Sequence, residues 1–304
     1  MTRVVIVIPT YRRPQSLERL LRELELQSCQ ESVAVVVADN DPIDCSGLAT
    51  VDKIANAGYR FPLSAVLVSE KGVSLVRNAL LRIALSELEA DFVALIDDDE
   101  WPRAEWLDAL LQAQTKFSAG VVAGPVVSVF DEIPSRAIAT CRCFQPERHD
   151  DGPLPIVWGA CNLLITRDTL MGLEAPWFDP AYGLSGGEDV ELFMRLRSQG
   201  CRFAWANNAR VFEQVPATRS RLSWVMRRAF RIGNTDMFSQ LRWRYARSPK
   251  VFVALRVIGQ AIVVALGLPF FLLLPRARIE ILYQSMRVFG KLAALGGIHY
   301  DEYA

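Results

Sequence analysis

The sequence contains little histidine, and its few cysteines are scattered. Only two of the 304 residues are His and six are Cys. Cys141 and Cys143 are the only close cysteine neighbours, and no second pair of ligands accompanies them, so neither a structural zinc site nor a disulfide framework is expected. His149 and His299 lie in no nucleophile-like context, which disfavours a Ser/His/Asp hydrolase.

Two common phosphate-binding motifs are also missing. No G-x-G-x-x-G follows the first apolar run, and no G-x-x-x-x-G-K-[ST] occurs anywhere. Dinucleotide-binding and P-loop functions therefore have no support. A hydrophobic fraction of 51% with 22% charged residues excludes a disordered or collagenous chain and leaves room for one large domain or two small ones.

The beginning of the chain has no pattern of a secretory signal. Met1-Thr2-Arg3 leads directly into an apolar run that ends at Pro9, which is too short for the apolar region of such a signal. We therefore expect the catalytic part to lie in the cytosol, which is a reducing compartment.

Charge is balanced overall but unevenly distributed. The chain carries 34 Lys and Arg against 34 Asp and Glu. Residues 1–218 hold 20 basic and 30 acidic side chains, whereas residues 219–304 hold 14 basic and 4 acidic ones. The two parts are therefore expected to face different partners.

Apolar β-branched runs alternate with amphipathic segments over the first 117 residues. This alternation is typical of βαβ units around a mostly parallel sheet, and it predicts an α/β fold. A later β-rich run and a further strand predict a mixed second half on the same sheet. The expected strands are 4–9, 33–38, 64–68, 92–96, 120–130 and 157–166, and the expected helices are 15–26, 48–57, 74–88, 104–116 and 189–198, with a loop over 131–155.

The C-terminal part divides by composition. Residues 219–250 predict a basic amphipathic helical segment, and residues 251–304 predict apolar helices that associate with a membrane, after a main domain over 1–218. Val257–Leu274 has no charge and is near the lower length limit of a membrane span. A buried core helix, a single span and an interfacial hairpin all remain open.

Two acidic clusters could carry chemistry. Asp97-Asp98-Asp99 follows an apolar strand, where adjacent carboxylates repel one another unless a cation compensates them. Hard oxygen ligands indicate Mg2+ or Mn2+; a solvent-exposed acidic turn is the alternative.

The second cluster is Gly186-Gly187-Glu188-Asp189, at the start of a predicted helix. Asp189 could cap that helix or serve as a general base that removes a proton from an attacking hydroxyl. Two acidic sites and a metal favour group transfer over hydride chemistry.

Five ordered motifs over about residues 1–215 resemble those of family 2 glycosyltransferases. The motifs are Val7-Ile8-Pro9-Thr10-Tyr11-Arg12-Arg13, Ala38-Asp39-Asn40, Gly72-Val73-Ser74-Leu75-Val76-Arg77-Asn78, Asp97-Asp98-Asp99 and Gly187-Glu188-Asp189. The resemblance implies a GT-A fold, which is a Rossmann-like mixed sheet flanked by helices, and an inverting transfer from a nucleotide-sugar.

The resemblance also implies roles for individual residues. Asp189 corresponds to the catalytic base, Asp99 to the direct metal ligand, and Asp97 to a residue near the ribose or the metal's waters. An ordinary structural role is the alternative for each. The expected nucleotide-sugar-binding residues are Pro9, Thr10, Tyr11, Arg12, Asp39 with its carboxylate on the uracil edge, Arg77 near the diphosphate, Asp97 and Asp98.

Three further positions are less directly matched. Trp158 and Glu188 are candidates for the acceptor side, although an aromatic residue on a strand can equally be core. Many GT-A enzymes have a late His as a further metal ligand, whereas Glu213 occupies the corresponding region here and could replace it. The Q-x-x-R-W of processive synthases is absent, which favours addition of a single sugar.

The basic segment and apolar tail resemble those of single-addition enzymes of bacterial exopolysaccharide assembly, particularly succinoglycan-type glucosyltransferases. That resemblance implies UDP-glucose as donor, a saccharide on polyprenyl diphosphate as acceptor, and a location at the cytoplasmic face of the inner membrane, with no nucleic acid partner. A transferase that acts on polyprenyl phosphate itself and a non-catalytic glycan- or lipid-binding scaffold remain alternatives.

Overall fold

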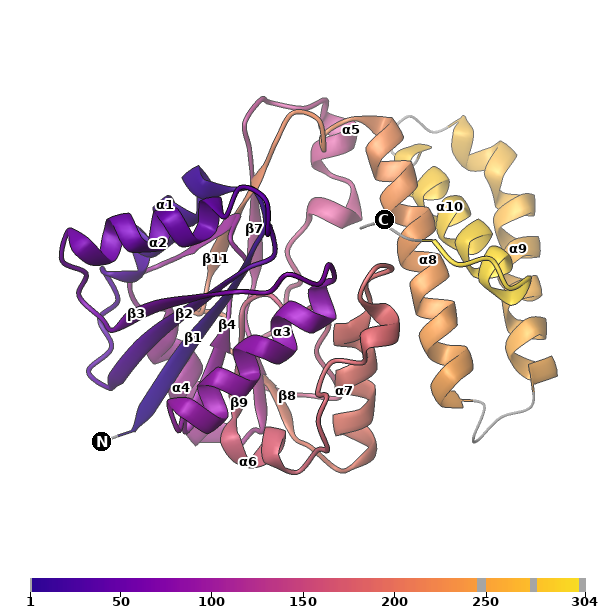
Figure 1. The fold of residues 1–304 in the computed structure, drawn as a ribbon. Coiled ribbons are helices and arrows are strands. Elements are labelled where there is room, and N and C mark those ends of the chain that lie inside the picture. Colours follow the sequence, from indigo (N-terminus) through magenta and orange to yellow (C-terminus); the bar gives the residue numbers. More distant parts are fainter. Residues whose placement is uncertain (1, 245–249, 274–277, 301–304) are drawn as a thin grey trace. The chain divides into compact units, whose positions relative to one another are not determined.

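A computed structural model describes residues 2–244, 250–273 and 278–300 (Figure 1). The chain forms two compact units. Unit 1 comprises Met1–Val127, Pro146–Leu184 and Glu191–Glu213, and unit 2 comprises Ser128–Gln145, Ser185–Val190 and Gln214–Ala304. The three-part division expected at residues 218 and 250 stays a prediction.

The large sheet contains eight strands in the order β3-β2-β1-β4-β9-β6-β10-β8. Strands β1, β2, β3 and β4 pair in parallel, and β9 runs antiparallel to both β4 and β6, so the predicted mixed sheet is confirmed. The strands are β1 (Arg3–Thr10), β2 (Ser32–Asp39), β3 (Leu63–Leu67), β4 (Phe92–Leu95), β6 (Val121–Ala123), β8 (Gly152–Leu154), β9 (Leu163–Thr166) and β10 (Phe203–Trp205).

A smaller sheet has the order β5-β11-β7, formed by β5 (Glu100–Pro102), β11 (Val211–Val215) and β7 (Val126–Phe130). The helices are α1 (Pro14–Leu24), α2 (Ser46–Asn56), α3 (Val73–Arg82), α4 (Trp106–Phe117), α5 (Arg136–Ala139), α6 (Arg167–Met171), α7 (Glu188–Ser198), α8 (Leu222–Arg244), α9 (Lys250–Leu272) and α10 (Arg278–Leu295).

Alternation along β1 divides the core of unit 1 into two layers. Val5 and Val7 pack on one face of the sheet, with side chains of α3, α6 and α7. Val4, Ile6 and Ile8 pack on the other, with side chains of α1, α2 and α4. Both faces are therefore buried, as continuous apolar strands predict.

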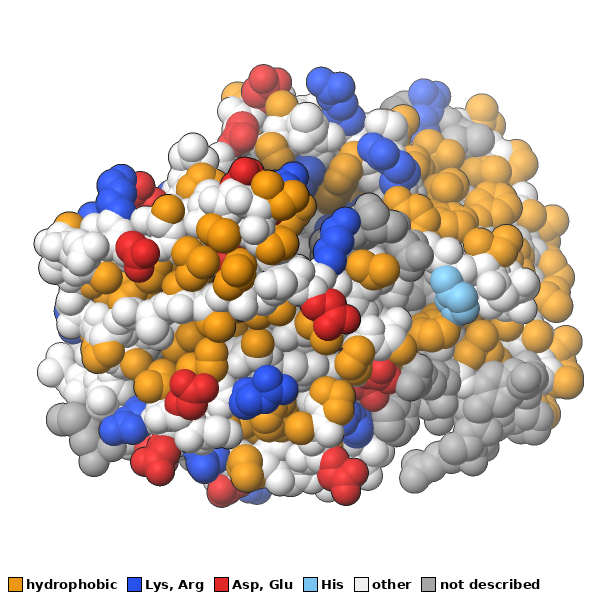
Figure 2. Space-filling model, in the orientation of Figure 1, with side chains coloured by type: hydrophobic (Ala, Val, Ile, Leu, Met, Phe, Trp, Pro, Cys, Tyr) orange, Lys and Arg blue, Asp and Glu red, His pale blue; other side chains and the backbone are white. Residues whose placement is uncertain are grey.

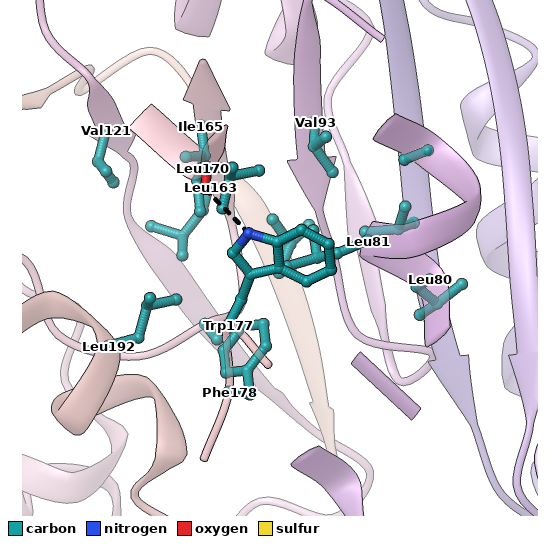
Figure 3. Close-up of a cluster of buried hydrophobic side chains, with 14 of the residues drawn as sticks. Leu80, Leu81, Val93, Val121, Leu163, Ile165, Leu170, Trp177, Phe178 and Leu192 are labelled. Atoms are coloured by element: carbon teal, nitrogen blue, oxygen red, sulfur yellow. Dashed lines mark hydrogen bonds between the residues drawn. The ribbon is translucent and has the colours of Figure 1, made fainter. Parts of the chain in front are cut away.

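Local sequence explains how these elements form and pack. In α1, Pro14 occupies the first turn, and four leucines at helical spacing are fully buried. In the other layer, the indole N–H of Trp177 donates to the Leu170 carbonyl oxygen at 2.9 Å, which satisfies the one polar atom of that side chain (Figure 3).

Two predicted strands differ from the observed ones. The expected strand 120–130 is two strands, β6 and β7, separated at Gly124-Pro125. The expected strand 157–166 is extended only over β9, because Asn162 has a φ of 54°. Its amide accepts from the Trp106 indole at 2.7 Å and donates to the Ala209 carbonyl at 2.7 Å, which holds the bend.

Unit 2 contains three long helices, α8, α9 and α10. Gly233 on α8 and Gly290 on α10 bring those two helices into backbone contact: a Cβ at Gly233 would lie 1.9 Å from the Arg287 carbonyl oxygen, and one at Gly290 2.0 Å from that of Phe230. Beside this crossing, the Asn234 amide donates to the Gly290 carbonyl at 3.2 Å and accepts from the Tyr300 N–H at 3.1 Å. The crossing therefore depends on residues without side chains.

Helix α9 has one packed side and one exposed apolar side. Val257 is 2% exposed and packs with Met237 of α8 and Ala294 of α10, whereas Val263 and Leu266 are 71% and 77% exposed. Figure 2 shows hydrophobic side chains gathered over this part of unit 2. Among the described residues, Val251–Phe270 is the one stretch whose length and composition would allow a membrane span, and only 6% of its most apolar window is buried. That exposure argues against the buried-core alternative.

We expect Gly290→Ala to destabilise unit 2 by about 1–3 kcal/mol, because its methyl group would meet the Phe230 carbonyl oxygen and force α8 and α10 apart. Gly259→Ala is the matched control in α9, where a Cβ meets no atom within 4 Å. The control should be neutral or stabilising by up to about 1 kcal/mol, since alanine favours helix. Denaturant unfolding of both variants in detergent measures the difference; equal stabilities would contradict the close crossing.

Candidate active site

Polar side chains meet at the carboxyl ends of neighbouring strands in unit 1. Pro9 and Thr10 end β1, Asp39 ends β2 in register with Thr10, and Asp97 follows β4. Because these strands run parallel, their carboxyl ends form one edge, and ligands of open α/β sheets bind at that edge. The sequence predicted this location for the chemistry.

Asp39 is fully buried and holds the start of α2. Its Oδ2 accepts hydrogen bonds from the Gly47 and Leu48 N–H groups at 2.8 and 3.2 Å, and its Oδ1 accepts from the Asp41 N–H at 3.0 Å. The carboxylate therefore has a structural role that sequence reasoning did not assign. Each carboxylate oxygen has two acceptor positions, so capacity for a ligand remains beside that role.

Arg12 forms a paired contact with a residue that sequence reasoning missed. Its Nε and Nη2 donate to the two carboxylate oxygens of Asp41 at 2.7 and 3.3 Å, and this hydrogen bond lowers the pKa of Asp41. The guanidinium also lies 5.1 Å from the centre of the Tyr11 ring, which is 43% exposed. Tyr11 is thus partly exposed near the end of β1, with the Arg12 guanidinium over its ring.

The carboxylates after β4 are joined to β1 and to the start of α1. Thr10 Oγ1 donates to Asp98 Oδ2 at 2.8 Å. Arg13 Nη1 donates to Asp98 Oδ1 at 2.8 Å and to Asp99 Oδ2 at 2.9 Å. Burial raises the pKa of Asp98 to about 6, although the positive charge of Arg13 opposes the shift.

Arg77 from α3 completes the positive side of this network. Its Nη2 donates to Asp97 Oδ1 at 3.2 Å, and the side chain is only 8% exposed. The Asp97 N–H in turn donates to Glu100 Oε2 at 3.1 Å. A buried guanidinium beside a carboxylate can also donate to a phosphate oxygen.

Further negative charge lies behind the Asp97-to-Asp99 run. Glu100 on β5 is 2% exposed and is the register partner of Glu213 on β11. Burial raises the pKa of Glu100 well above its usual value, and the charges of Asp97 and Glu213 add to the shift. Such crowding needs compensating positive charge.

The donor set fits a divalent cation, because hard carboxylate oxygens crowd at one place. Within residues 2–244, 250–273 and 278–300, however, no three His, Cys, Asp or Glu side chains converge closely enough to hold an ion. Asp97, Asp99 and Glu213 therefore supply the right chemistry without forming a ready three-ligand site.

Asp189 lies in the first turn of α7, in unit 2. Gly186 and Gly187 lead into this turn with φ values of 74° and 92°, which favour glycine. Asp189 Oδ1 accepts from the Val190 N–H at 2.7 Å, and the preceding Glu188 is 3% exposed. In the same unit, burial is the main cause of the raised pKa of Asp236, and the charge of Asp189 adds to it.

Trp158 lies outside the observed strand and is 51% exposed. The core alternative for this side chain is therefore wrong, and its ring remains available to a ligand.

Among the site residues missed from sequence, Arg13 stands within a motif that was recognised. Its position directly before Pro14, where α1 begins, was the available signal.

The sequence comparisons agree with one another. The model of the family described as "Glycosyl transferase family 2" matches residues 5–168. The chain is 32% identical over 242 residues to the "Succinoglycan biosynthesis protein ExoM" of Rhizobium meliloti (strain 1021), which covers 76% of this chain and 72% of that protein. It is 24% identical over 247 residues to the chondroitin synthase of Pasteurella multocida (strain Pm70), covering 69% of this chain but only 24% of the synthase.

Solved structures share the fold at low identity. The mannosyltransferase PcManGT from Pyrobaculum calidifontis, solved with GDP-Man and Mn2+, has a TM-score of 0.59 at 18% identity. The match covers 96% of this chain and 86% of the PcManGT chain. S. aureus TarS 1-349, solved with UDP, has a TM-score of 0.54 at 16% identity, and the match covers 99% of this chain and 93% of the TarS chain.

These likenesses confirm the predicted GT-A fold. The family model spans more than half of the chain, and it begins within β1 and ends beyond the Asp97-to-Asp99 run. Together with the ExoM match, this shows that the chain belongs to glycosyl transferase family 2.

Proposed function

We propose that the protein transfers a single glucose from UDP-glucose to a saccharide on polyprenyl diphosphate, in bacterial exopolysaccharide or other surface polysaccharide biosynthesis. The observation that carries the proposal is the match to a succinoglycan biosynthesis protein over 76% of the chain, added to family membership. The chain covers 72% of that protein, so the likeness extends beyond the family's catalytic motifs.

The strand-end edge of unit 1 would bind the donor. Pro9, Thr10, Tyr11 and Arg12 would border the nucleotide, and Asp39 would accept from the uracil edge. Arg77 would contact the diphosphate, supported by its burial and by its place beside Asp97. TarS bound to UDP or UDP-GlcNAc and PcManGT bound to GDP-Man support a nucleoside-diphosphate sugar as donor.

Asp99 and Asp97, with Glu213 as a further oxygen donor, would hold Mg2+ or Mn2+. Such an ion neutralises charge that develops on the departing diphosphate. The Mn2+ bound to PcManGT and the crowded carboxylates of this chain support the assignment. Arg13 would share in balancing Asp98 and Asp99 while Thr10 fixes the orientation of Asp98.

Asp189 would be the general base and Glu188 an acceptor-side residue, with the exposed Trp158 ring stacking on a sugar. Asp189 removes a proton from the acceptor hydroxyl as that oxygen attacks the anomeric carbon. Attack from the face opposite the diphosphate inverts the configuration, so an α-linked donor gives a β-linked product. No covalent intermediate on the enzyme is needed.

The C-terminal helices would seat the enzyme on the cytoplasmic face of the inner membrane. Helix α9 offers the exposed apolar surface, and residues 219–256 add ten basic side chains against one acidic one. Basic segments beside an apolar helix are attracted by anionic lipids.

Asp189→Asn should lower kcat by about 10²–10⁴-fold and leave the affinity for UDP-glucose nearly unchanged, because only proton removal is lost. Initial rates of UDP release and calorimetric titration of UDP-glucose measure the two quantities. The surface variant Asp52→Asn is the control and should change neither. Equal loss of donor binding in Asp189→Asn would make Asp189 a structural residue rather than a base.

Arg13→Met should lower the free energy of unfolding by about 1–2 kcal/mol, because Asp98 and Asp99 lose their shared cation. The loss is modest because the Arg13 side chain is 40% exposed, so that solvent screens its charge. Mn2+ should then raise the melting temperature of the variant more than that of the wild type. Arg22→Met on the exposed side of the same helix should change stability by less than about 0.5 kcal/mol. An unchanged melting temperature of Arg13→Met without metal would contradict the compensating role.

A further inference from the structure

Unit 2 gathers three cationic side chains beside the apolar helix. Lys291 on α10 donates from Nζ to Gln260 Oε1 on α9 at 3.0 Å. One turn earlier on α10, Arg287 Nη2 lies 2.5 Å from Asp236 Oδ2 of α8, with both side chains about one quarter exposed. Burial lowers the pKa of Lys291, and the positive charges of Arg287 and of Arg256 on α9 lower it further. Arg287 and Lys291 are one turn apart on α10, and Arg256 lies one turn before Gln260, the partner of Lys291, on α9.

Negative charge in this part of the chain is scarce. Asp236 is the single acidic residue in the sequence between 219 and 279, and Glu280 is the single one between 278 and 300. Glu280 accepts from Gln284 at 2.8 Å within the first turns of α10. Among the described residues of this group, Asp236 is the carboxylate in contact with a cation, through Arg287.

Around this group, cationic and polar side chains lie beside an exposed apolar surface, a combination that is rare on water-soluble proteins. Gln260 is the strongly polar residue within the apolar stretch 257–274, and it is directed to Lys291 rather than to solvent. On the same helix, Ile262, Val263 and Leu266 are 54%, 71% and 77% exposed, and Val263 lies one turn after Gln260 on the same face. An anionic head and a long apolar chain on the same molecule would satisfy both features.

The cation group and Asp189 belong to the same compact unit, and the charge of Asp189 adds to the raised pKa of Asp236. Asp236 is in turn the ion-pair partner of Arg287. The residue proposed as the acceptor's base and the excess positive charge are thus parts of one compact unit.

We propose that Arg256, Arg287 and Lys291 bind the diphosphate of the prenyl-linked acceptor, with the prenyl chain along the exposed apolar side of α9. The inference rests on the proposed function and names the residues that would recognise its acceptor. Charge-assisted hydrogen bonds from Arg and Lys suit phosphate oxygens, and three cations exceed the charge of Asp236 by enough to balance a diphosphate ester. A neutral glycan acceptor would have no use for this charge.

The test measures binding of undecaprenyl diphosphate to the full chain in neutral-detergent micelles. Lys291→Met and Arg287→Gln should each weaken binding at least tenfold, while UDP-glucose affinity and binding to phosphatidylglycerol vesicles stay unchanged. Lys291→Arg keeps the charge and should restore binding, which guards against simple misfolding. Lys53→Met, which removes an exposed lysine of unit 1 that pairs with Glu18, is the matched control and should have no effect.

Three outcomes would overturn the assignment in distinguishable ways. Wild-type binding that Lys291→Met and Arg287→Gln leave intact would reject these residues and spare the proposed function. Equal loss of undecaprenyl diphosphate and phosphatidylglycerol binding would show general membrane adhesion instead of an acceptor site. No binding by the wild type, in the presence of UDP-glucose turnover with another acceptor, would reject the prenyl diphosphate itself.

Discussion

The crowding of carboxylates after β4 is the constraint on which the strand-end edge of unit 1 depends. Asp97, Asp98 and Asp99 are consecutive, and buried Glu100 stands directly behind them. Such a group is stable only if positive charge and hydrogen-bond donors converge on it from other elements. The protein supplies Arg13 from the start of α1, Arg77 from α3 and the Thr10 hydroxyl from β1. The charged side chains that stabilise this edge are thus the same ones that a nucleotide-sugar and a cation would contact.

Sequence pattern predicted the sheet and its polar edge well because both depend on local signals. Continuous apolar β-branched runs and helical leucine spacing specify β1, β2 and α1, and the last residues of parallel strands lie at the edge where ligands bind. The bend at Asn162 escaped prediction because the partners of its amide, Trp106 and Ala209, are far away in sequence. The same amide donates to the Pro125 carbonyl at 3.1 Å, at the break that divides 120–130 into β6 and β7. Arg13 escaped for the same reason, since its partners lie 85 and 86 residues away.

Unit 2 illustrates a further limit of sequence pattern. Basic and apolar periodicity predicted α8, α9 and α10 as helices, yet two glycines decide how α8 and α10 cross. The crossing places Asn234 against the chain near Tyr300 and leaves α9 packed on one side only. A helix with one polar-anchored side and one exposed apolar side suits contact with lipid better than a buried core does. That asymmetry, rather than hydrophobicity alone, is the reason why we propose an amphipathic substrate for the C-terminal helices.

The most direct measurement of the central claim is release of UDP from a panel of UDP-sugars by the purified full chain with Mn2+ or Mg2+, with and without a membrane lipid extract from cells that make exopolysaccharide. The account predicts release from UDP-glucose, and only when the extract is present, because the proposed acceptor is lipid-linked. Release that is equally fast without extract, or no release from any UDP-sugar with extract and metal present, would contradict it.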